Sequence, residues 1–425
     1  MFFRRTVRTA AVAGAIAMVA LGVVTVTPGA AFTAPAQPGN GATLHQLTLP
    51  APKKPAMKSS KANVTNKGDC ATAQANLKSF AAKGQKTVSC TTVGSMPPKG
   101  GMTPAVVPPC ASLETGIWWY QRDGACMISY ITETIFEAND GEILGQAFFQ
   151  VNQDLSLQYN RTTYFENETI TFYDYWGLGD TTHELTMVGY CDGSCTLLDG
   201  SAWDNLISPG QTVYGQTVYE GVTFGPRTYS ATGYVFQLLV PSAASTGPLY
   251  WYGPPTIRCD GELNNVGAGC VFPEWTPIWG ASVAAYGAAA LNIDIAELYL
   301  PDGWGLVTPL TRQTDQGRMD ANRNAVCSGF ISFGGTDSCD EYAFASTHQS
   351  GGELGLRFAN CAEVGYTQAG GQWVWYEVRW TGNEHCLIGH VDLASNVSLG
   401  RSLSNEVYTP YRVLDGDPFY VYATA

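Results

Sequence analysis

The sequence predicts an exported, multidomain protein in which a central all-β antiparallel sandwich or barrel is followed by a small α+β domain. Three observations predict this fold class: an N-terminal export signal, a long region of alternating strand-like segments, and a C-terminal region that mixes helices with strands. The 425 residues suffice for two domains besides a signal and a linker. The predicted regions are a signal peptide (1–31), a linker (32–110), a β-rich domain (111–250) and a C-terminal domain (251–425).

The first 31 residues have the pattern of a secretory signal peptide. Three arginines among the first eight residues precede an apolar run over about 10–26, and Gly29-Ala30-Ala31 supplies the small residues of a cleavage site. No stop-transfer pattern follows the run, so a retained membrane anchor is the weaker interpretation. We expect a secreted, extracellular protein with no membrane span once the signal is removed.

Twelve cysteines follow the signal, and an even number in an exported chain predicts six disulfides. Sequence alone leaves the connectivity open, and the simplest hypothesis joins neighbours along the chain. These pairs are Cys70–Cys90, Cys110–Cys126, Cys191–Cys195, Cys259–Cys270, Cys327–Cys339 and Cys361–Cys386. Structural zinc is the alternative, but the cysteines and histidines lack the usual zinc-site spacing.

Region 32–110 is rich in Pro, Ala and Lys, a composition typical of a linker. One short helix is expected within it, over 71–83. Segment 51–100 holds nine Lys and a single acidic residue, Asp69, and is a candidate for contacts with DNA phosphates or an anionic cell-wall polymer. Region 251–425 instead carries eight Arg, no Lys and nineteen acidic residues, which argues against tight DNA binding there without a metal ion.

Region 111–250 predicts antiparallel β-structure. Apolar and polar residues alternate over segments such as 143–151, 169–173 and 234–240, and Gly, Asn and Asp turns separate them. The aromatic residues of this region indicate either a surface that binds carbohydrate such as cell-wall glycan, or simply the core of a sandwich. They include Trp118, Trp119, Tyr120, Tyr175, Trp176 and Tyr214.

Region 251–425 combines helical and strand patterns. The predicted helices cover 280–300, with Leu298 on its apolar face, and a segment from Thr314 or Asp315 to Cys327. The predicted strands cover 373–380, 387–391, 412–414 and 419–422. We expect 387–391 to be the partner of 373–380.

Two adjacent carboxylates, Asp340 and Glu341, lie between Cys339 and the apolar, aromatic segment 342–345. Burying such a pair is unfavourable unless a metal ion, an arginine or a catalytic role offsets the loss of hydration. The alternative is an exposed turn in which Glu341 forms a salt bridge. The pair is therefore the main candidate for a site.

The run Ser338–His348 resembles the CDEYPFAST signature of the NucA/NucB deoxyribonucleases, secreted non-specific endonucleases that need a divalent metal. Further segments are similar to this family in the same order along the chain. They are Pro309–Arg312 with Asp320–Arg323 and Cys327, then Asn396, Gly400 and Asn405, and last Arg412–Phe419. Cys259-Asp260 and Gly269–Pro273 look like the lead-in of longer members, so the resemblance covers roughly 255–421.

The resemblance implies a small α+β nuclease domain with a metal-finger-like site, one Mg²⁺ or Mn²⁺ ion, and DNA as a non-specific substrate. It implies Asp340 as base or water-positioning group and Glu341 as metal ligand or orienting group, with the two roles interchangeable. Asn396 and Glu406 are the other implied metal ligands, although Asn396 also fits a left-handed turn. The remaining candidates are His348 as a surrogate base, His390 with Asp392 as a second metal pair, and Arg318, Arg323 and Asn405 as substrate contacts.

The chain also departs from the family pattern. Ala343 stands in place of Pro, Ser395 in place of an acidic residue, and 349–352 in place of Glu-Gly-Gly, so the acidic position falls on Gln349 or Glu353. Losing such groups would reduce transition-state stabilisation by several kcal/mol. The sequence thus predicts a secreted, metal-dependent endonuclease that hydrolyses DNA, or a catalytically degenerate relative that acts as an extracellular cell-wall or protein binding module.

Overall fold

The computed structural model describes residues 43–47, 49, 56–62, 64–66, 70–94, 110, 114–199, 203–223, 227–264 and 266–425. The predicted signal peptide, 1–31, lies outside the described residues. Strands dominate and form sheets of nine, seven, five and three strands, which confirms a β-rich chain with several sheets. Within the described ranges, no helix is long and apolar enough to cross a bilayer.

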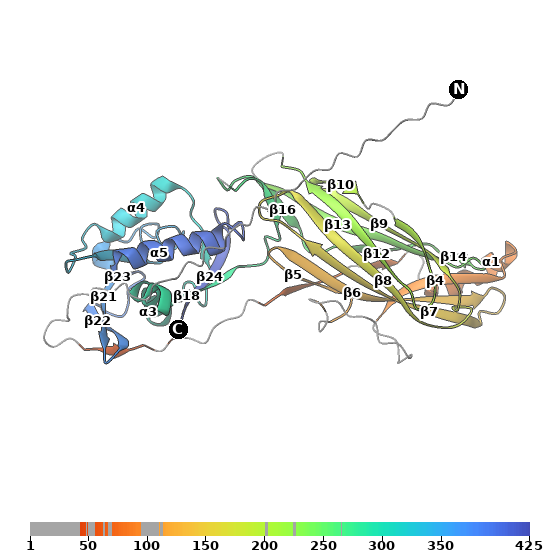
Figure 1. Ribbon diagram of the computed structural model, residues 1–425, viewed down its shortest axis with the longest axis horizontal. Coiled ribbons are helices and arrows are strands. Elements are labelled where there is room, and N and C mark those ends of the chain that lie inside the picture. Colours follow the sequence, from red (N-terminus) through yellow and green to blue (C-terminus); the bar gives the residue numbers. More distant parts are fainter. Residues whose placement is uncertain are drawn as a thin grey trace, which may run out of the picture. The chain divides into compact units, whose positions relative to one another are not determined.

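The nine-stranded sheet has the order β10-β12-β8-β7-β6-β4-β14, with β5 added on β6 and β2 on β5. Its long strands lie side by side in Figure 1 and pair antiparallel, while the short β14 joins β4 in parallel. The strands are β2 (Lys58–Lys61), β4 (Thr87–Gly94), β5 (Ile117–Gln121), β6 (Gly124–Glu137), β7 (Ile143–Ser156), β8 (Thr163–Gly177), β10 (Cys195–Asp199), β12 (Thr212–Gly221) and β14 (Ala244–Ser245).

The seven-stranded sheet has the order β11-β9-β13-β15-β3, and β16 joins β13 to β17. Its strands are β3 (Val64–Asn66), β9 (His183–Gly193), β11 (Trp203–Ile207), β13 (Arg227–Leu239), β15 (Leu249–Tyr252), β16 (Ile257–Asp260) and β17 (Gly269–Val271). Phe149 and Val151 of β7 and Met187 and Phe236 of the second sheet belong to one buried cluster. The two sheets therefore share a core, as in a β-sandwich.

The predicted bounds of the β-rich domain, 111–250, are too narrow. Strand β4 and helix α1 (Cys70–Ala82) come from the predicted linker, yet β4 pairs with β6 along its whole length and Leu77 of α1 packs against it. At the other end, β16 and β17 continue the second sheet to Val271. The Pro and Lys residues around β4 give this segment a linker-like composition, although its eight residues form a strand that pairs with β6. The short helix expected over 71–83 is confirmed.

The aromatic residues of this region divide between the core and the surface. Trp118 and Tyr120 are buried in the shared core, and Trp119 is partly buried. Tyr175, Trp176 and Tyr214 remain exposed, at 38%, 45% and 75%. Core packing therefore accounts for part of the aromatic content of this region.

Two carboxylates are buried between the sheets. Glu166 accepts hydrogen bonds from Gln153 Nε2 at 2.7 Å and Tyr234 Oη at 2.6 Å, and Glu168 accepts one from Thr217 Oγ1 at 2.6 Å. Burial raises the pKa of both carboxyls because the charged form loses its hydration, and the neighbouring charge of Glu168 raises that of Glu166 further. The pKa of Glu168 reaches about 7.

This raised pKa gives the fold a pH dependence. A carboxyl whose pKa is higher in the folded state contributes stability below its unfolded pKa, here 4.5, and loses it as pH rises to about 7. The Glu168→Gln side chain is neutral at every pH, like a protonated Glu168. The free energy of unfolding of this variant should therefore exceed that of wild type by about 1–3 kcal/mol above pH 7, and by less toward pH 4.5. Urea unfolding between pH 4.5 and 8 measures this difference. The exposed Glu184→Gln is the control, and a pH-independent difference for Glu168→Gln would contradict the prediction.

The C-terminal region contains the five-stranded sheet, in the order β1-β22-β21-β23-β20, and the three-stranded sheet, in the order β18-β24-β19. Their strands are β1 (His45–Gln46), β18 (Ile278–Ser282), β19 (Leu310–Thr311), β20 (Asp337–Tyr342), β21 (Ala362–Ala369), β22 (Gln372–Arg379), β23 (Leu387–Asp392) and β24 (Pro418–Thr424). The helical elements are α2 (Val283–Tyr286), α3 (Ala288–Tyr299), α4 (Gln316–Cys327), the 3-10 turn η1 (Phe358–Asn360), α5 (Leu393–Leu403) and the π-helical η2 (Ser404–Tyr408).

Several predicted elements of this region differ from the structure. The partner of β22 is β21, and β23 lies between β21 and β20 instead of pairing with β22. The segment predicted as one helix over 280–300 begins as β18 and breaks at Gly287, whose φ of 52° is outside the helical range. Leu298 is 44% exposed and does not belong to the buried face. Helix α4 ends at Cys327 as expected, and Asp315 caps it through Arg318 N.

A buried ionic cluster joins strands of the sandwich to the end of the chain, within the compact unit Ala34–Ala425. Arg122 and Arg258 both contact the carboxylate of Asp417, at 2.8 and 2.7 Å. Arg412 Nε donates to Asp260 at 3.0 Å, and both side chains are fully buried. The prediction of a strand over 412–414 is wrong, because Arg412 adopts a left-handed turn (φ 43°) that directs its side chain into this cluster.

All six predicted disulfides are formed: Cys70–Cys90, Cys110–Cys126, Cys191–Cys195, Cys259–Cys270, Cys327–Cys339 and Cys361–Cys386. Cys259–Cys270 joins β16 to β17 and therefore belongs to the sandwich, although the sequence assigns it to the C-terminal domain. Cys327–Cys339 joins the end of α4 to β20. This bridge fixes α4 beside the two adjacent carboxylates.

Candidate functional site

Strand β20 carries both carboxylates and lies at the edge of its sheet, where β23 is its one partner among the described strands. Asp340 and Glu341 are consecutive, and consecutive side chains of a strand point to opposite faces. Asp340 contacts α3 through Asn292, whereas Glu341 contacts α4 through Arg323 and Cys327. Each carboxylate thus has its own environment.

Both carboxylates nevertheless line one cavity of about 150 Å³ that is open to solvent. The cavity lies along the free edge of β20, between α4, α5 and η2. Among its lining residues are Asp340, Glu341, Arg323, Asn396, Ser346 and Tyr408. Two carboxylates, one guanidinium and one amide predicted from sequence therefore meet at one opening.

Asp340 is held by a buried amide of α3. Asn292 Nδ2 donates to the backbone oxygen of Asp340 at 3.0 Å and to its Oδ2 at 3.1 Å, while Tyr366 Oη donates to Asn292 Oδ1 at 2.9 Å. Gly389 lies opposite Asp340 in β23, and a Cβ there would stand 2.4 Å from Asn292 Oδ1. Only glycine leaves room for this arrangement.

Glu341 has a cationic neighbour, Arg323, and the described residues show no ion pair for Asp340. Arg323 Nε lies 3.7 Å from Glu341 Oε1, and the Arg323 side chain is 56% exposed at the mouth of the cavity. Arg323 also contacts Asp320 at 3.4 Å on its own helix. It therefore offsets the charge of Glu341 only in part and keeps donors that face solvent.

Burial raises the pKa of both carboxyls. The pKa of Asp340 lies well above its usual value because of burial and the charge of Glu341, against which the hydrogen bond from Asn292 acts. Burial also raises the pKa of Glu341, while Arg323 and backbone N–H groups oppose the shift. Two buried acids in an open cavity with little compensating positive charge are typical of a functional site.

Asn396 lies in helix α5, which corrects its prediction as a turn or loop residue. Its Nδ2 donates to Cys339 O at 3.2 Å and Ser338 Oγ at 3.4 Å, so the amide bridges α5 to the free edge of β20. The carbonyl oxygen Oδ1 is then the atom that a ligand in the cavity would meet. Asp392 caps α5 through Ser395 N and is not free to form a metal pair with His390.

The other predicted site residues lie outside the cavity lining. Glu406 accepts from Trp279 Nε1 at 2.9 Å, and Asn405 is exposed in η2. His348 contacts Asp415 at 3.3 Å, away from the carboxylate pair.

The predicted substrate contact Arg318 forms a two-point ion pair with Glu353. The same carboxylate also accepts hydrogen bonds from the side-chain amides of Gln313 and Asn322. Gln349 accepts from Thr311 N at 2.8 Å. His390 is buried between Asp337 and Glu363, at 2.8 and 3.1 Å.

The donors in the cavity suit a hard divalent cation. Carboxylate and amide oxygens are the ligands that Mg²⁺ and Mn²⁺ prefer, and such ions keep several waters, so few protein ligands are needed. Burial raises the pKa of both acids, and a bound cation would favour their charged forms. Asp340, Glu341 and Asn396 bring ligands of this kind to the cavity lining, whereas Glu406 is not among the lining residues.

Comparisons with known proteins add little. No protein-family model matches the chain. No curated protein matches it either. Among solved structures, the cryo-EM reconstruction of native E. coli alpha-2-macroglobulin is 12% identical, with a TM-score of 0.18, and the match covers 31% of this chain and 8% of that chain. A similarity at that TM-score carries no argument about fold or function.

Asn292 is the site residue that sequence reasoning missed. A visible signal exists, because Asn292 is an amide inside the mostly apolar run 288–296. A buried amide in such a run needs partners, and here they are Asp340 and Tyr366.

Removing this amide should destabilise the site. Asn292→Ala leaves Asp340 and Tyr366 without their shared partner, so the free energy of unfolding should fall by about 1–3 kcal/mol. The exposed Asn324→Ala in α4 is the control and should be nearly neutral. Urea unfolding of both variants measures the effect, and equal stabilities would contradict the role assigned to Asn292.

Proposed function

We propose that the C-terminal region is a metal-dependent endonuclease that hydrolyses phosphodiester bonds of DNA without sequence specificity. The observation that supports the proposal most is the meeting of Asp340, Glu341, Asn396 and Arg323 at one solvent-open cavity. These residues come from β20, α4 and α5, which the NucA/NucB resemblance names as the site-bearing segments. Their meeting at one cavity is an observation separate from their order along the chain.

Each side chain has a role in this proposal. Asp340, oriented by Asn292 through Oδ2, presents Oδ1 to accept a proton from the attacking water. Glu341 and Asn396 Oδ1 would hold the cation, and Arg323 at the rim would contact a phosphate oxygen. A bound Mg²⁺ or Mn²⁺ would supply positive charge to the phosphate and to both acids, which lowers the pKa of Asp340 toward the ionised base.

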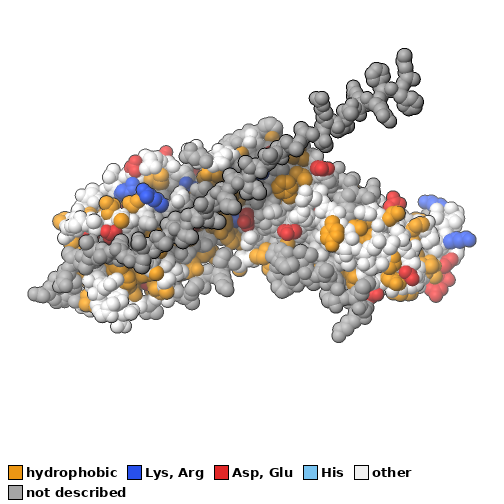
Figure 2. Space-filling model, in the orientation of Figure 1, with side chains coloured by type: hydrophobic (Ala, Val, Ile, Leu, Met, Phe, Trp, Pro, Cys, Tyr) orange, Lys and Arg blue, Asp and Glu red, His pale blue; other side chains and the backbone are white. Residues whose placement is uncertain are grey.

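The net negative charge of region 251–425 affects how DNA would bind there. Region 251–425 has nineteen acidic residues against eight Arg, so its average charge repels phosphates. In Figure 2 basic side chains gather over helix α4, the helix that carries Arg318 and Arg323. Because Arg318 is neutralised by Glu353, Arg323 is the better candidate for a phosphate contact. Binding should therefore depend on the divalent ion more than on a basic surface.

Nicking of supercoiled plasmid DNA tests the proposal. Wild type should nick with Mg²⁺ or Mn²⁺ and stop when a chelator is added. Asp340→Asn and Glu341→Gln should each lower the rate by about 100-fold or more, because each removes a charge from the reacting centre. Glu184→Gln in the sandwich is the matched control and should keep the wild-type rate. Unaltered nicking by both site variants would exclude the assignment.

A catalytically degenerate binding module is the second candidate, and the exposed Tyr175, Trp176 and Tyr214 of the sandwich favour it. Exposed aromatic rings stack on sugar rings or pack on protein partners. Wild-type protein inactive with both metals, but retained on cell-wall polymer, would support this candidate over the nuclease.

A further inference from the structure

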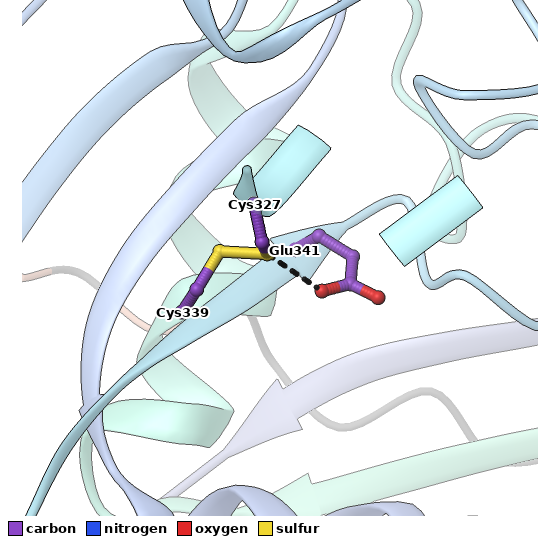
Figure 3. Close-up of side chains that lie close together, drawn as sticks. All are labelled: Cys327, Cys339 and Glu341. Atoms are coloured by element: carbon purple, nitrogen blue, oxygen red, sulfur yellow. Dashed lines mark hydrogen bonds between the residues drawn. A yellow bond between two sulfur atoms is a disulfide. The ribbon is translucent and has the colours of Figure 1, made fainter. Parts of the chain in front are cut away.

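The Cys327–Cys339 disulfide lies directly against the carboxylate of Glu341. Cys327 ends α4, while Cys339 and Glu341 are two residues apart in β20 and so share the face that α4 covers. Cys327 Sγ and Glu341 Oε2 are 3.3 Å apart, and Figure 3 shows the carboxylate directed toward that sulfur. A disulfide sulfur carries neither proton nor charge, so this contact adds nothing to the partial compensation that Arg323 gives the charge of Glu341.

The two sulfurs and the Glu341 carboxylate lie close together, so one metal ion could bind all three once the S–S bond is broken and the sulfurs move apart. Both sulfurs and a carboxylate oxygen lie within 4.8 Å of one another, and this is the one such group among the described residues. Tetrahedral Zn²⁺ with bonds of about 2.3 Å to sulfur and about 2.1 Å to oxygen holds its ligands about 3.6–3.8 Å apart. Thiolates select Zn²⁺ and related soft ions over Mg²⁺.

We propose that reduction of the Cys327–Cys339 disulfide creates a site for Zn²⁺ or Cd²⁺, with the two thiolates and the Glu341 carboxylate as protein ligands. A dithiol reductant supplies two electrons and two protons: the S–S bond breaks, each sulfur gains a proton, and the reductant leaves as its own disulfide. Binding of the ion releases both thiol protons to solvent. The fourth position faces the cavity and takes water.

The surroundings favour a cation at this point. Cys339 and Glu341 line the open cavity, which gives an ion and a reductant a path to the group. Both cysteines of the pair are partly exposed, whereas Cys361 and Cys386 of the nearby disulfide are each 1% exposed. Cys327 ends α4, where the carbonyl ends of the helix carry partial negative charge that favours a cation.

The site uses the carboxylate that the hard-cation site also needs. With the disulfide formed, Glu341 offers oxygen alone, and with the disulfide reduced it joins two thiolates. Zinc in the reduced protein would therefore remove Glu341 from the proposed nuclease centre. This last consequence rests on the proposed function, whereas metal binding by the reduced protein does not.

Cadmium binding by the full chain tests the proposal. The protein is reduced with a water-soluble phosphine, which takes oxygen from water and leaves as its oxide, and is then freed of reductant without oxygen. Absorption by cadmium thiolate reports binding during titration with Cd²⁺. Reduced wild type should bind about one ion more per chain than a Cys327→Ser/Cys339→Ser variant, and Glu341→Gln should weaken that binding about 10-fold or more. The Cys361→Ser/Cys386→Ser variant is the matched control and should keep the site.

Equal cadmium uptake by reduced wild type and the Cys327→Ser/Cys339→Ser variant would overturn the proposal, as would an unchanged affinity in Glu341→Gln. Thermal unfolding covers the case in which reduction loosens the fold. Cadmium should raise the melting temperature of reduced wild type and leave that of the Cys327→Ser/Cys339→Ser variant unchanged, and the absence of this difference also overturns the proposal. Plasmid nicking by the oxidised protein is independent of these results.

Discussion

Two adjacent carboxylates are buried at the free edge of one strand, and much of the C-terminal region is arranged around their burial. Asp340 and Glu341 leave β20 on opposite faces, so a helix must cover each face: α3 brings Asn292 to one and α4 brings Arg323 to the other. Neither helix supplies a full counter-charge. Burial therefore raises the pKa of both acids, and the charge of Glu341 raises that of Asp340 further.

The two acids differ because their partners differ. Asp340 is held by a neutral amide, which fixes its orientation while burial favours its protonated form. Glu341 faces a guanidinium and a disulfide, and Arg323 and backbone N–H groups moderate the effect of burial. Neighbouring carboxylates with different environments suit different roles in one reaction, and this favours Asp340 as base and Glu341 as ligand. The sequence leaves these two roles interchangeable.

Local patterns predict much of this chain, and long-range packing accounts for what they miss. The export context and the cysteine order predict all six disulfides, and alternation predicts the long strands β6, β7, β8 and β13. Strand β4 is not predicted, because its pairing with β6 outweighs a linker-like composition. The left-handed conformation of Arg412 is not predicted either, because it depends on a contact with the buried Asp260, which is distant in sequence.

The candidate site follows the same division. Asp340, Glu341, Arg323 and Asn396 are predicted by motif and meet at one cavity, although Asn396 does so from a helix. Glu406 and His348 are equally close to the motifs in sequence, yet their side chains face Trp279 and Asp415. Which side chains converge depends on the pairing of β20 with β23 and on the position of α5, and neither is visible in local sequence.

The proposed site at the edge of β20 holds one hard cation through Glu341 and Asn396, with Asp340 beside it. A crystal structure of the oxidised protein grown with Mn²⁺, with the ion located by its anomalous scattering, tests it most directly. We expect a single strong peak within coordination distance of carboxylate oxygens of Glu341 or Asp340 and of Asn396 Oδ1, and no such peak in crystals of Glu341→Gln. An empty cavity at saturating Mn²⁺, or a peak coordinated by other residues, would contradict it.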